Sequence, residues 1–217
     1  EEEAAAAQAI GRDSGKGGAE GTGADAPYEF PAPDLEFAQG RMDDIARAFT
    51  SSGEINTEVI LSHQRENGER MMGKITIEDA FTSRELLSDA IAFVRGQLIT
   101  QTARCICICV PKSKIMYPLV WWAGNWPFSI EQDGVFLELV SREGIKTWFL
   151  PLESGGLNLL KGVELDASCN LLWSMPSLFP PGTKTPEWQE PPKVPVDDPW
   201  AEFFAQGAEE EAKKNKQ

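Results

Sequence analysis

The sequence predicts an α+β domain with a mainly antiparallel sheet and with its helices packed largely on one face. Two segments with helical apolar periodicity stand among segments in which apolar residues alternate or run continuously. Two dipeptides, Asn67-Gly68 and Asp133-Gly134, have the residue types that hairpin turns require. Residues 175–217 are instead rich in proline, which lacks the backbone donor that helix and sheet interiors need.

The 217 residues fit one domain with long ends, and composition divides them into three parts. Residues 1–33 form an acidic head rich in glycine and alanine, which we expect to be disordered because it buries too little apolar surface. Residues 34–174 form the α+β core domain. Residues 175–217, here called the strap, are expected to be extended and to end in a short charged helix.

The first half of the core begins with a helix predicted over residues 34–51, with Asp34 as its N-cap. Alternating residues predict a strand over 55–63 with one face in solvent. A return strand over 70–78 follows the turn at Asn67-Gly68. The apolar stripe of the helix comprises Leu35, Ala38, Met42, Ile45, Ala46 and Phe49.

A second helix is predicted over residues 83–102, with Thr82 and Glu85 as a capping box. Residues 104–110 are apolar on both faces, which is typical of a central strand. Four further strands complete an antiparallel meander, with predicted ranges 115–122, 128–131, 135–140 and 145–150.

The charge balance limits the partners that the protein is expected to have. There are 34 Asp and Glu against 20 Lys and Arg, which gives a formal net charge of -14. Such a chain is poorly suited to nucleic acid or to anionic membranes, because both attract Lys and Arg. No apolar stretch approaches the roughly 20 residues that a membrane-spanning helix needs, so we expect no transmembrane segment.

Three of the four cysteines, Cys105, Cys107 and Cys109, alternate within one apolar run. Packing in the core is the favoured interpretation, since zinc ligands usually sit two to four residues apart on a turn. A metal site and a redox sensor are the alternatives, and no metal or cofactor is expected. Reduced thiols favour an intracellular compartment. Together with the first residue, Glu rather than Met, they lead us to expect an organelle matrix, plastid or mitochondrion, over the cytosol.

Residues with catalytic potential are few. His63 is the only histidine, and we expect it to have a surface or structural role at the end of its strand. The sequence Gly15-Lys16-Gly17-Gly18 lies in the head rather than between a strand and a helix, which argues against a phosphate-binding loop. Whether the protein is an enzyme stays open, and we lean toward a non-catalytic role.

Aromatic residues are the most unusual feature, with seven tryptophans in the chain. Some are expected to face outward and to bind a partner, because tryptophan is enriched in binding hot spots. The strap aromatics are expected to dock either on this domain or on a neighbour. The candidate partner-binding residues are Trp121, Trp122, Trp126, Trp188, Trp200, Phe203 and Phe204.

Three functional hypotheses follow. The first is a non-catalytic structural or interaction subunit of a larger intracellular assembly, which binds protein partners or other copies through these aromatics. The second is a small-molecule-binding domain or enzyme with a pocket lined by Trp121, Trp126 and Trp148. The third is a redox- or metal-responsive regulator that uses the cysteine row and therefore requires accessible thiols.

Overall fold

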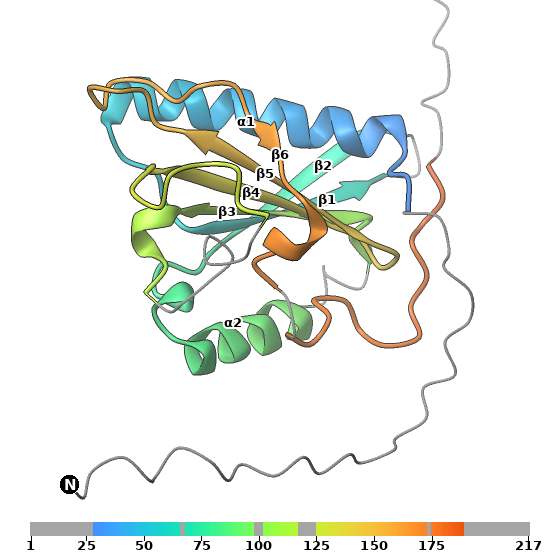
Figure 1. Ribbon diagram of the computed structural model, residues 1–217. Helices are drawn as coiled ribbons and strands as arrows, with labels where there is room; N and C mark the ends of the chain where they lie inside the picture. The colour runs from blue at the N-terminus through green and yellow to red at the C-terminus, as the bar shows by residue number, and fades with distance from the viewer. Residues whose placement is uncertain (1–27, 66–67, 98–101, 117–124, 173–174, 189–217) are drawn as a thin grey trace, which may run out of the picture.

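Figure 1 shows a computed structural model of the chain, which describes residues 28–65, 68–97, 102–116, 125–172 and 175–188. An antiparallel sheet has the strand order β2-β1-β3-β4-β5-β6, which confirms the α+β class. The two helices are α1 (Ala32–Ser52) and α2 (Arg84–Gly96). The strands are β1 (Glu58–Gln64), β2 (Arg70–Thr76), β3 (Cys105–Pro111), β4 (Gly134–Val140), β5 (Ile145–Pro151) and β6 (Val163–Glu164). Short 3-10 turns are η1 (Ala80–Thr82), η2 (Lys112–Lys114) and η4 (Ala167–Cys169).

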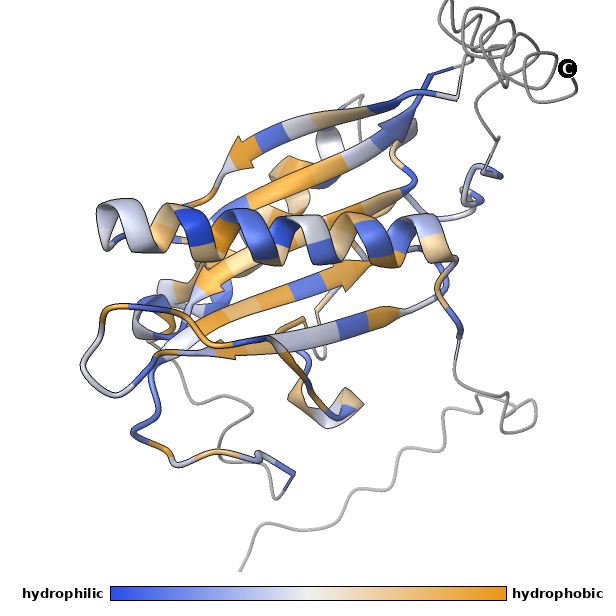
Figure 2. Cartoon of the chain, turned by 90° about the horizontal axis from the view of Figure 1, so that it is seen from above, coloured by the Kyte–Doolittle hydropathy of each residue, from blue (hydrophilic) through white to orange (hydrophobic). Residues whose placement is uncertain are grey.

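The two helices lie on opposite faces of the sheet, so the expectation that they share one face is wrong (Figure 1). Phe37, Ala38 and Met42 of α1 pack on one face. Leu87 and Ile91 of α2 pack on the other. The physical reason is that the central strands are apolar on both faces, and each face must be covered. Figure 2 looks onto α1, which crosses the mostly hydrophobic strands and turns hydrophilic residues toward the viewer.

Burial of both faces also corrects the prediction for β1, which was expected to have one face in solvent. Its residues from Val59 to His63 are all buried. Val59 and Leu61 face α2, whereas Ile60 faces α1. The prediction for β3 is confirmed, because all seven of its residues are buried between the two layers.

Helix ends differ from the predictions by a few residues. The helix α1 begins two residues before Asp34, so Asp34 lies inside the first turn rather than at the cap. The cap of α2 is Ser83, whose side chain accepts a hydrogen bond from the backbone N–H of Leu86 at 3.2 Å. The capping residue is thus one position later than Thr82, and α2 ends at Gly96.

The predicted strand over 128–131 is wrong, because these residues form a turn in which Gln132 N–H donates to the backbone oxygen of Ser129 at 3.1 Å. The predicted strand over 115–122 lies mostly outside the described residues, as do residues 1–27 of the head and most of the strap. Within the described residues, neither helix combines the length and hydropathy needed to cross a bilayer.

Glycine is required at two of the predicted turn positions for different reasons. Gly68 has a φ of 80°, as the turn between β1 and β2 demands. Gly134 instead begins β4, so Asp133-Gly134 is not a hairpin turn. A Cβ atom at Gly134 would lie 2.3 Å from the backbone oxygen of Leu150 and 2.6 Å from Cζ of Phe149. The neighbouring strand therefore excludes any side chain here.

We expect G134A to lower the free energy of unfolding by about 3 kcal/mol, because the added methyl group meets backbone and a buried ring. The matched control is G40A in α1, where nothing lies within 4 Å of the added atom. It should raise stability by about 0.5–1 kcal/mol through helix propensity. Urea unfolding measures both variants, and equal effects would contradict the assigned close approach.

Candidate functional site

Trp188 lies at the end of the described part of the strap and is half-buried against two arginines. The ring centroid is 5.1 Å from the guanidinium carbon of Arg70 and 5.8 Å from that of Arg104. The Nη1 of Arg104 also donates to the backbone oxygen of Pro186. Cation–π contacts of this kind contribute about 0.5–2 kcal/mol each. The strap is therefore anchored on its own domain at this point.

Both arginines of this anchor are held by the buried carboxylate of Asp34, which is only 1% exposed. Arg104 Nε donates to Asp34 Oδ1 at 2.9 Å, and Arg70 Nη2 lies 3.9 Å from the same oxygen. The Cys105 thiol donates to it as well, with a sulfur–oxygen distance of 3.6 Å. Asp34 thus turns inward to an ion pair, which explains why it does not cap the helix.

The preceding part of the strap is also docked on the domain. Leu178 and Phe179 are each 2% exposed and belong to the core on the α2 side of the sheet. The guanidinium of Arg142 lies 4.3 Å from the Phe179 ring centroid, and its Nε donates to Thr183 Oγ1 at 2.8 Å. For residues 178–188, docking on the same chain is therefore the arrangement that the structure describes.

Trp126, another predicted partner-binding residue, is half-buried within an aromatic cluster on the α2 side. Its ring centroid lies 4.9 Å from that of Phe149 and 5.2 Å from that of Phe128, both in edge-to-face geometry. Most of its surface is thus used by the core. The other predicted residues, Trp121, Trp122, Trp200, Phe203 and Phe204, lie outside the described residues.

The sheet separates two of the tryptophans that were expected to line one pocket. Trp126 packs on the α2 side, whereas Trp148 belongs to the core on the α1 side. Neighbouring residues of β5 point to opposite faces, and Trp148 is adjacent to Phe149, which contacts Trp126. These two rings therefore cannot line a common pocket.

The cysteine row is core, as the favoured interpretation predicted. Cys105, Cys107 and Cys109 are each 0% exposed and face α1. Burial raises the pKa of the Cys105 thiol to about 12 and also raises the pKa values of the Cys107 and Cys109 thiols. Because the thiolate is the form that binds metals and attacks oxidants, these groups are poorly suited to either task.

His63 is 6% exposed, so of the surface and structural roles that were expected for it, the buried position favours the structural one. Burial lowers the pKa of its imidazole, and a hydrogen bond with the backbone of Thr102 partly opposes this shift. The Nδ1 atom also lies 3.3 Å from Thr102 Oγ1. Burial between β1 and the start of β3 therefore favours the neutral form of the imidazole.

Glu138 in β4 is a buried carboxyl group that is not among the candidate residues predicted from the sequence. It is 0% exposed, and Oε2 accepts hydrogen bonds from Leu171 N–H at 2.7 Å and from Thr147 Oγ1 at 3.0 Å. Burial raises the pKa of Glu138 to about 7. A single acid within the apolar run of residues 135–140 was the available signal for it.

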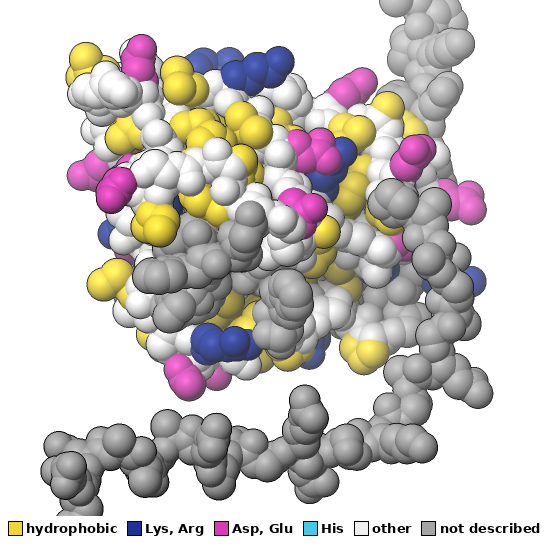
Figure 3. All heavy atoms as spheres, in the orientation of Figure 1, with side chains coloured by type: hydrophobic (Ala, Val, Ile, Leu, Met, Phe, Trp, Pro, Cys, Tyr) yellow, Lys and Arg dark blue, Asp and Glu magenta, His cyan; other side chains and the backbone are white. Residues whose placement is uncertain are grey.

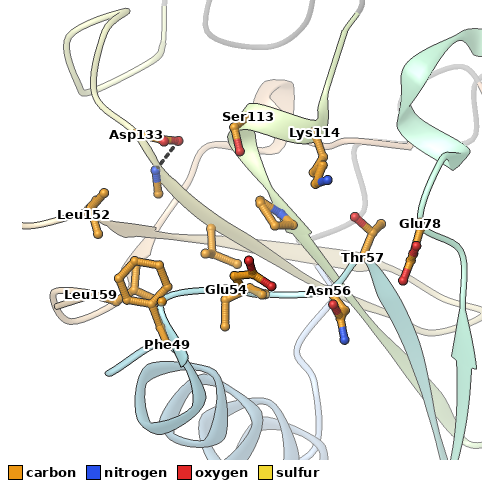
Figure 4. Close-up of a pocket in the computed structure, with 15 residues that line it drawn as sticks. Phe49, Glu54, Asn56, Thr57, Glu78, Ser113, Lys114, Asp133, Leu152 and Leu159 are labelled. Carbon is orange, nitrogen blue, oxygen red and sulfur yellow. Dashed lines mark hydrogen bonds between the residues drawn. The ribbon is translucent and has the colours of Figure 1, made fainter. Parts of the chain in front are cut away.

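A cavity of about 550 Å³ lies at the end of the sheet where β1 and β4 begin and β3 and β5 end. Figure 4 shows Phe49, Leu152 and Leu159 along one side of it, and Thr57, Glu78 and Lys114 along the other. No sequence motif marks this cavity, because its lining residues come from five separate segments of the chain.

Thr57 is the most unusual residue of the cavity lining. It is 1% exposed, yet its hydroxyl has no hydrogen-bond partner among the described residues. Leaving a buried hydroxyl without a partner costs about 1–3 kcal/mol. The polar side of the cavity therefore contains an unused hydrogen-bonding group.

Several large apolar side chains are exposed elsewhere on the described surface. Leu86 and Phe93 lie seven positions apart on α2 and are 45% and 57% exposed, and Met72 on the edge strand β2 is 55% exposed. Figure 3 shows hydrophobic side chains dispersed among acidic and basic groups on one face of the molecule. Dispersed residues of this kind are ordinary on protein surfaces.

Comparison with known proteins found no matching family model, no matching curated protein and no matching solved structure. Inferences about function therefore depend on the residues of this chain alone.

We expect D34N to lower the free energy of unfolding by about 3–5 kcal/mol, because Arg104 would be left buried without its counter-charge. The matched control is D44N on the outer side of α1, where the carboxylate pairs with Arg41 and Arg47 in contact with solvent. Its loss should stay below about 1 kcal/mol. Equal losses in urea unfolding would contradict the importance of the buried pair.

The raised pKa of Glu138 predicts that stability depends on pH. Between the ordinary value of 4.5 and about 7, the folded state binds a proton that the unfolded state has released. The resulting stabilisation is complete below about pH 4.5 and is lost as the pH rises to about 7, amounting to roughly 3 kcal/mol. E138Q should lose this pH dependence, whereas E36Q, which changes an exposed carboxylate, should retain it.

Urea unfolding at a series of pH values between 4.5 and 8 measures this effect. A free energy of unfolding that falls equally with pH in E138Q and in the unmodified protein would assign the dependence to other groups.

Proposed function

We propose that the protein is a non-catalytic structural or interaction subunit of a larger intracellular assembly. We further propose that residues 189–217, the distal part of the strap, are its partner-binding arm. The observation that carries the proposal is the anchoring of Trp188 on Arg70 and Arg104. A strap that served only to close its own core would need no aromatic residues beyond this anchor. The sequence nevertheless continues to Trp200, Phe203 and Phe204.

The anchor supports a binding role because it fixes Trp188, the residue directly before the distal part of the strap, on the domain. Prolines at 191, 192, 195 and 199 restrict the backbone that follows. A restricted segment loses less conformational entropy when it binds, so more of the contact energy appears as affinity. Extended proline-rich segments with aromatic anchors are an established recognition mode.

The chemistry of the buried residues supports a non-catalytic role for the core. Burial raises the pKa values of the three thiols in the cysteine row and lowers the pKa of His63. Neither group is placed to act as a nucleophile or base on a substrate at the surface. Four buried free cysteines also suit a reducing compartment, which supports the proposed intracellular location.

Light scattering tests the self-association form of the proposal. We expect the full chain to show a solution mass above that of one 23.9 kDa chain. A chain that ends after Trp188 should be monomeric and equally stable, because it keeps Leu178, Phe179 and the anchor. A cut before Leu178 would remove core residues and would confuse binding with folding.

The full-length variant W200A/F203A/F204A should also be monomeric, whereas the control E209A/E210A/E211A changes three residues of the same segment and should assemble normally. If the full chain and the shortened chain are both monomeric, the self-association form is wrong. Enrichment from a cell extract then tests binding to another protein. The full chain should enrich a defined partner, and W200A/F203A/F204A should fail to do so.

A further inference from the structure

The cavity at the end of the sheet has features of a ligand site that are independent of the strap. Its volume of about 550 Å³ falls within the range of small-molecule pockets, about 300–1,000 Å³. Its walls come from the end of α1, the segment before β1, the turn η2, the start of β4 and the segment that follows β5. Each of these elements belongs to the described part of the chain, so the geometry of this lining is defined.

The first indication of a ligand is Thr57, which is 1% exposed and has a hydroxyl without a partner among the described residues. Its backbone is fixed, because its carbonyl oxygen accepts a hydrogen bond from Ile77 N–H at 3.0 Å. Figure 4 shows the hydroxyl oxygen on the cavity side, turned toward Lys114. A ligand group that reaches this hydroxyl would supply the hydrogen-bond partner that it lacks.

The second indication is the charge of the lining. Glu54, Glu78 and Asp133 contribute three carboxylates, against the single ammonium group of Lys114. Glu54 and Glu78 form no ion pair within the described residues. The excess of unpaired carboxylates favours a cation, and the formal net charge of -14 increases the attraction at long range.

The third indication is the apolar wall. Phe49, Leu152 and Leu159 face the polar residues across the cavity. A bare metal ion would leave this wall unused, and the described residues contain no group of three His, Cys, Asp or Glu placed to hold one. An organic ligand with an apolar body can cover the wall while its charged end reaches the carboxylates.

From these three observations we propose that the cavity binds a small organic cation, an ammonium or guanidinium group carried on an apolar body. The cation lies between Glu54 and Glu78, the apolar body lies against Phe49 and Leu159, and Thr57 hydrogen-bonds the ligand. The same chemistry is present in a free amine and in a basic side chain of a peptide. Both sources fit the open cavity, and the probes below distinguish them.

Titration of the full chain, followed by backbone amide NMR signals, tests the proposal with phenethylamine as the probe. Saturable shifts are expected at Thr57, Lys114 and Gly134 and not at Arg70 or Arg104. Phenethyl alcohol and hydrocinnamate share the apolar body without the cation, and each should bind at least about tenfold more weakly. Methylammonium has the charge without the body and should also bind weakly.

Other outcomes of the titration would overturn the proposal. Equal binding of hydrocinnamate would remove the requirement for a cation. Saturable shifts with magnesium chloride, or phenethylamine shifts located at the strap anchor, would assign the chemistry elsewhere. Tighter binding of a short lysine-containing peptide than of phenethylamine would identify a peptide side chain as the source, and the reverse would identify a free amine.

Variants separate a ligand site from general electrostatic attraction. E54Q/E78Q should weaken phenethylamine binding by about tenfold. E36Q/E69Q makes the same change in net charge at exposed positions away from the cavity and should leave the affinity unchanged. Equal weakening in both double variants would overturn the proposal, because it would show attraction by net charge alone.

T57V tests the hydroxyl with a side chain of the same shape. It should weaken phenethylamine binding about fivefold. It should also raise the Tm of the free protein, because the buried unpartnered hydroxyl is removed. A residue with a purely structural role would not combine a higher Tm with weaker phenethylamine binding. An unchanged affinity in both T57V and E54Q/E78Q would overturn the proposal.

Discussion

Burial of the central strands on both faces is the constraint on which the rest of the structure depends. All residues of β3 and β4 are buried, and β1 is exposed only in part at its ends. A sheet of this kind is stable only if a second layer covers each face. The helix α1 covers the face with the cysteine row, and α2 covers the other together with Leu171, Leu178 and Phe179. The first part of the strap is thus a required part of the core.

The same constraint explains where polar groups become important. In a core buried from both sides, each charged group must be paired or its ionisation must change. Asp34 and Arg104 follow the first route, since they form a buried ion pair that joins α1 to the start of β3. Glu138 follows the second, since burial raises its pKa to about 7. The ion pair also holds the cation on which Trp188 rests, and so links the strap anchor to the core.

The sequence predicted the elements whose signal is local. The apolar run of β3, the hairpin of β4 and β5 and the stripe of α1 were found because periodicity and turn residues carry that information. Prediction from the sequence failed where the packing contacts come from segments that are distant along the chain. The alternation in β1 suggested a solvent face because nothing local shows that α1 covers Ile60. Trp188 was expected to dock, but its partners Arg70 and Arg104 are distant in sequence. Even the nearer one, Arg104, precedes Trp188 by more than 80 residues.

The strap anchor and the cavity lie at opposite ends of the strands, which makes the two proposed activities separable. Arg70 and Arg104 stand where β2 and β3 begin, and the cavity is where β3 ends and β1 and β4 begin. A seven-residue strand spans about 20–24 Å, a distance at which exposed charges are largely screened at physiological ionic strength. A ligand in the cavity therefore has no direct electrostatic effect on the anchor. Any coupling between ligand binding and assembly would have to pass through the packed strands, whose close-packed core resists small displacements.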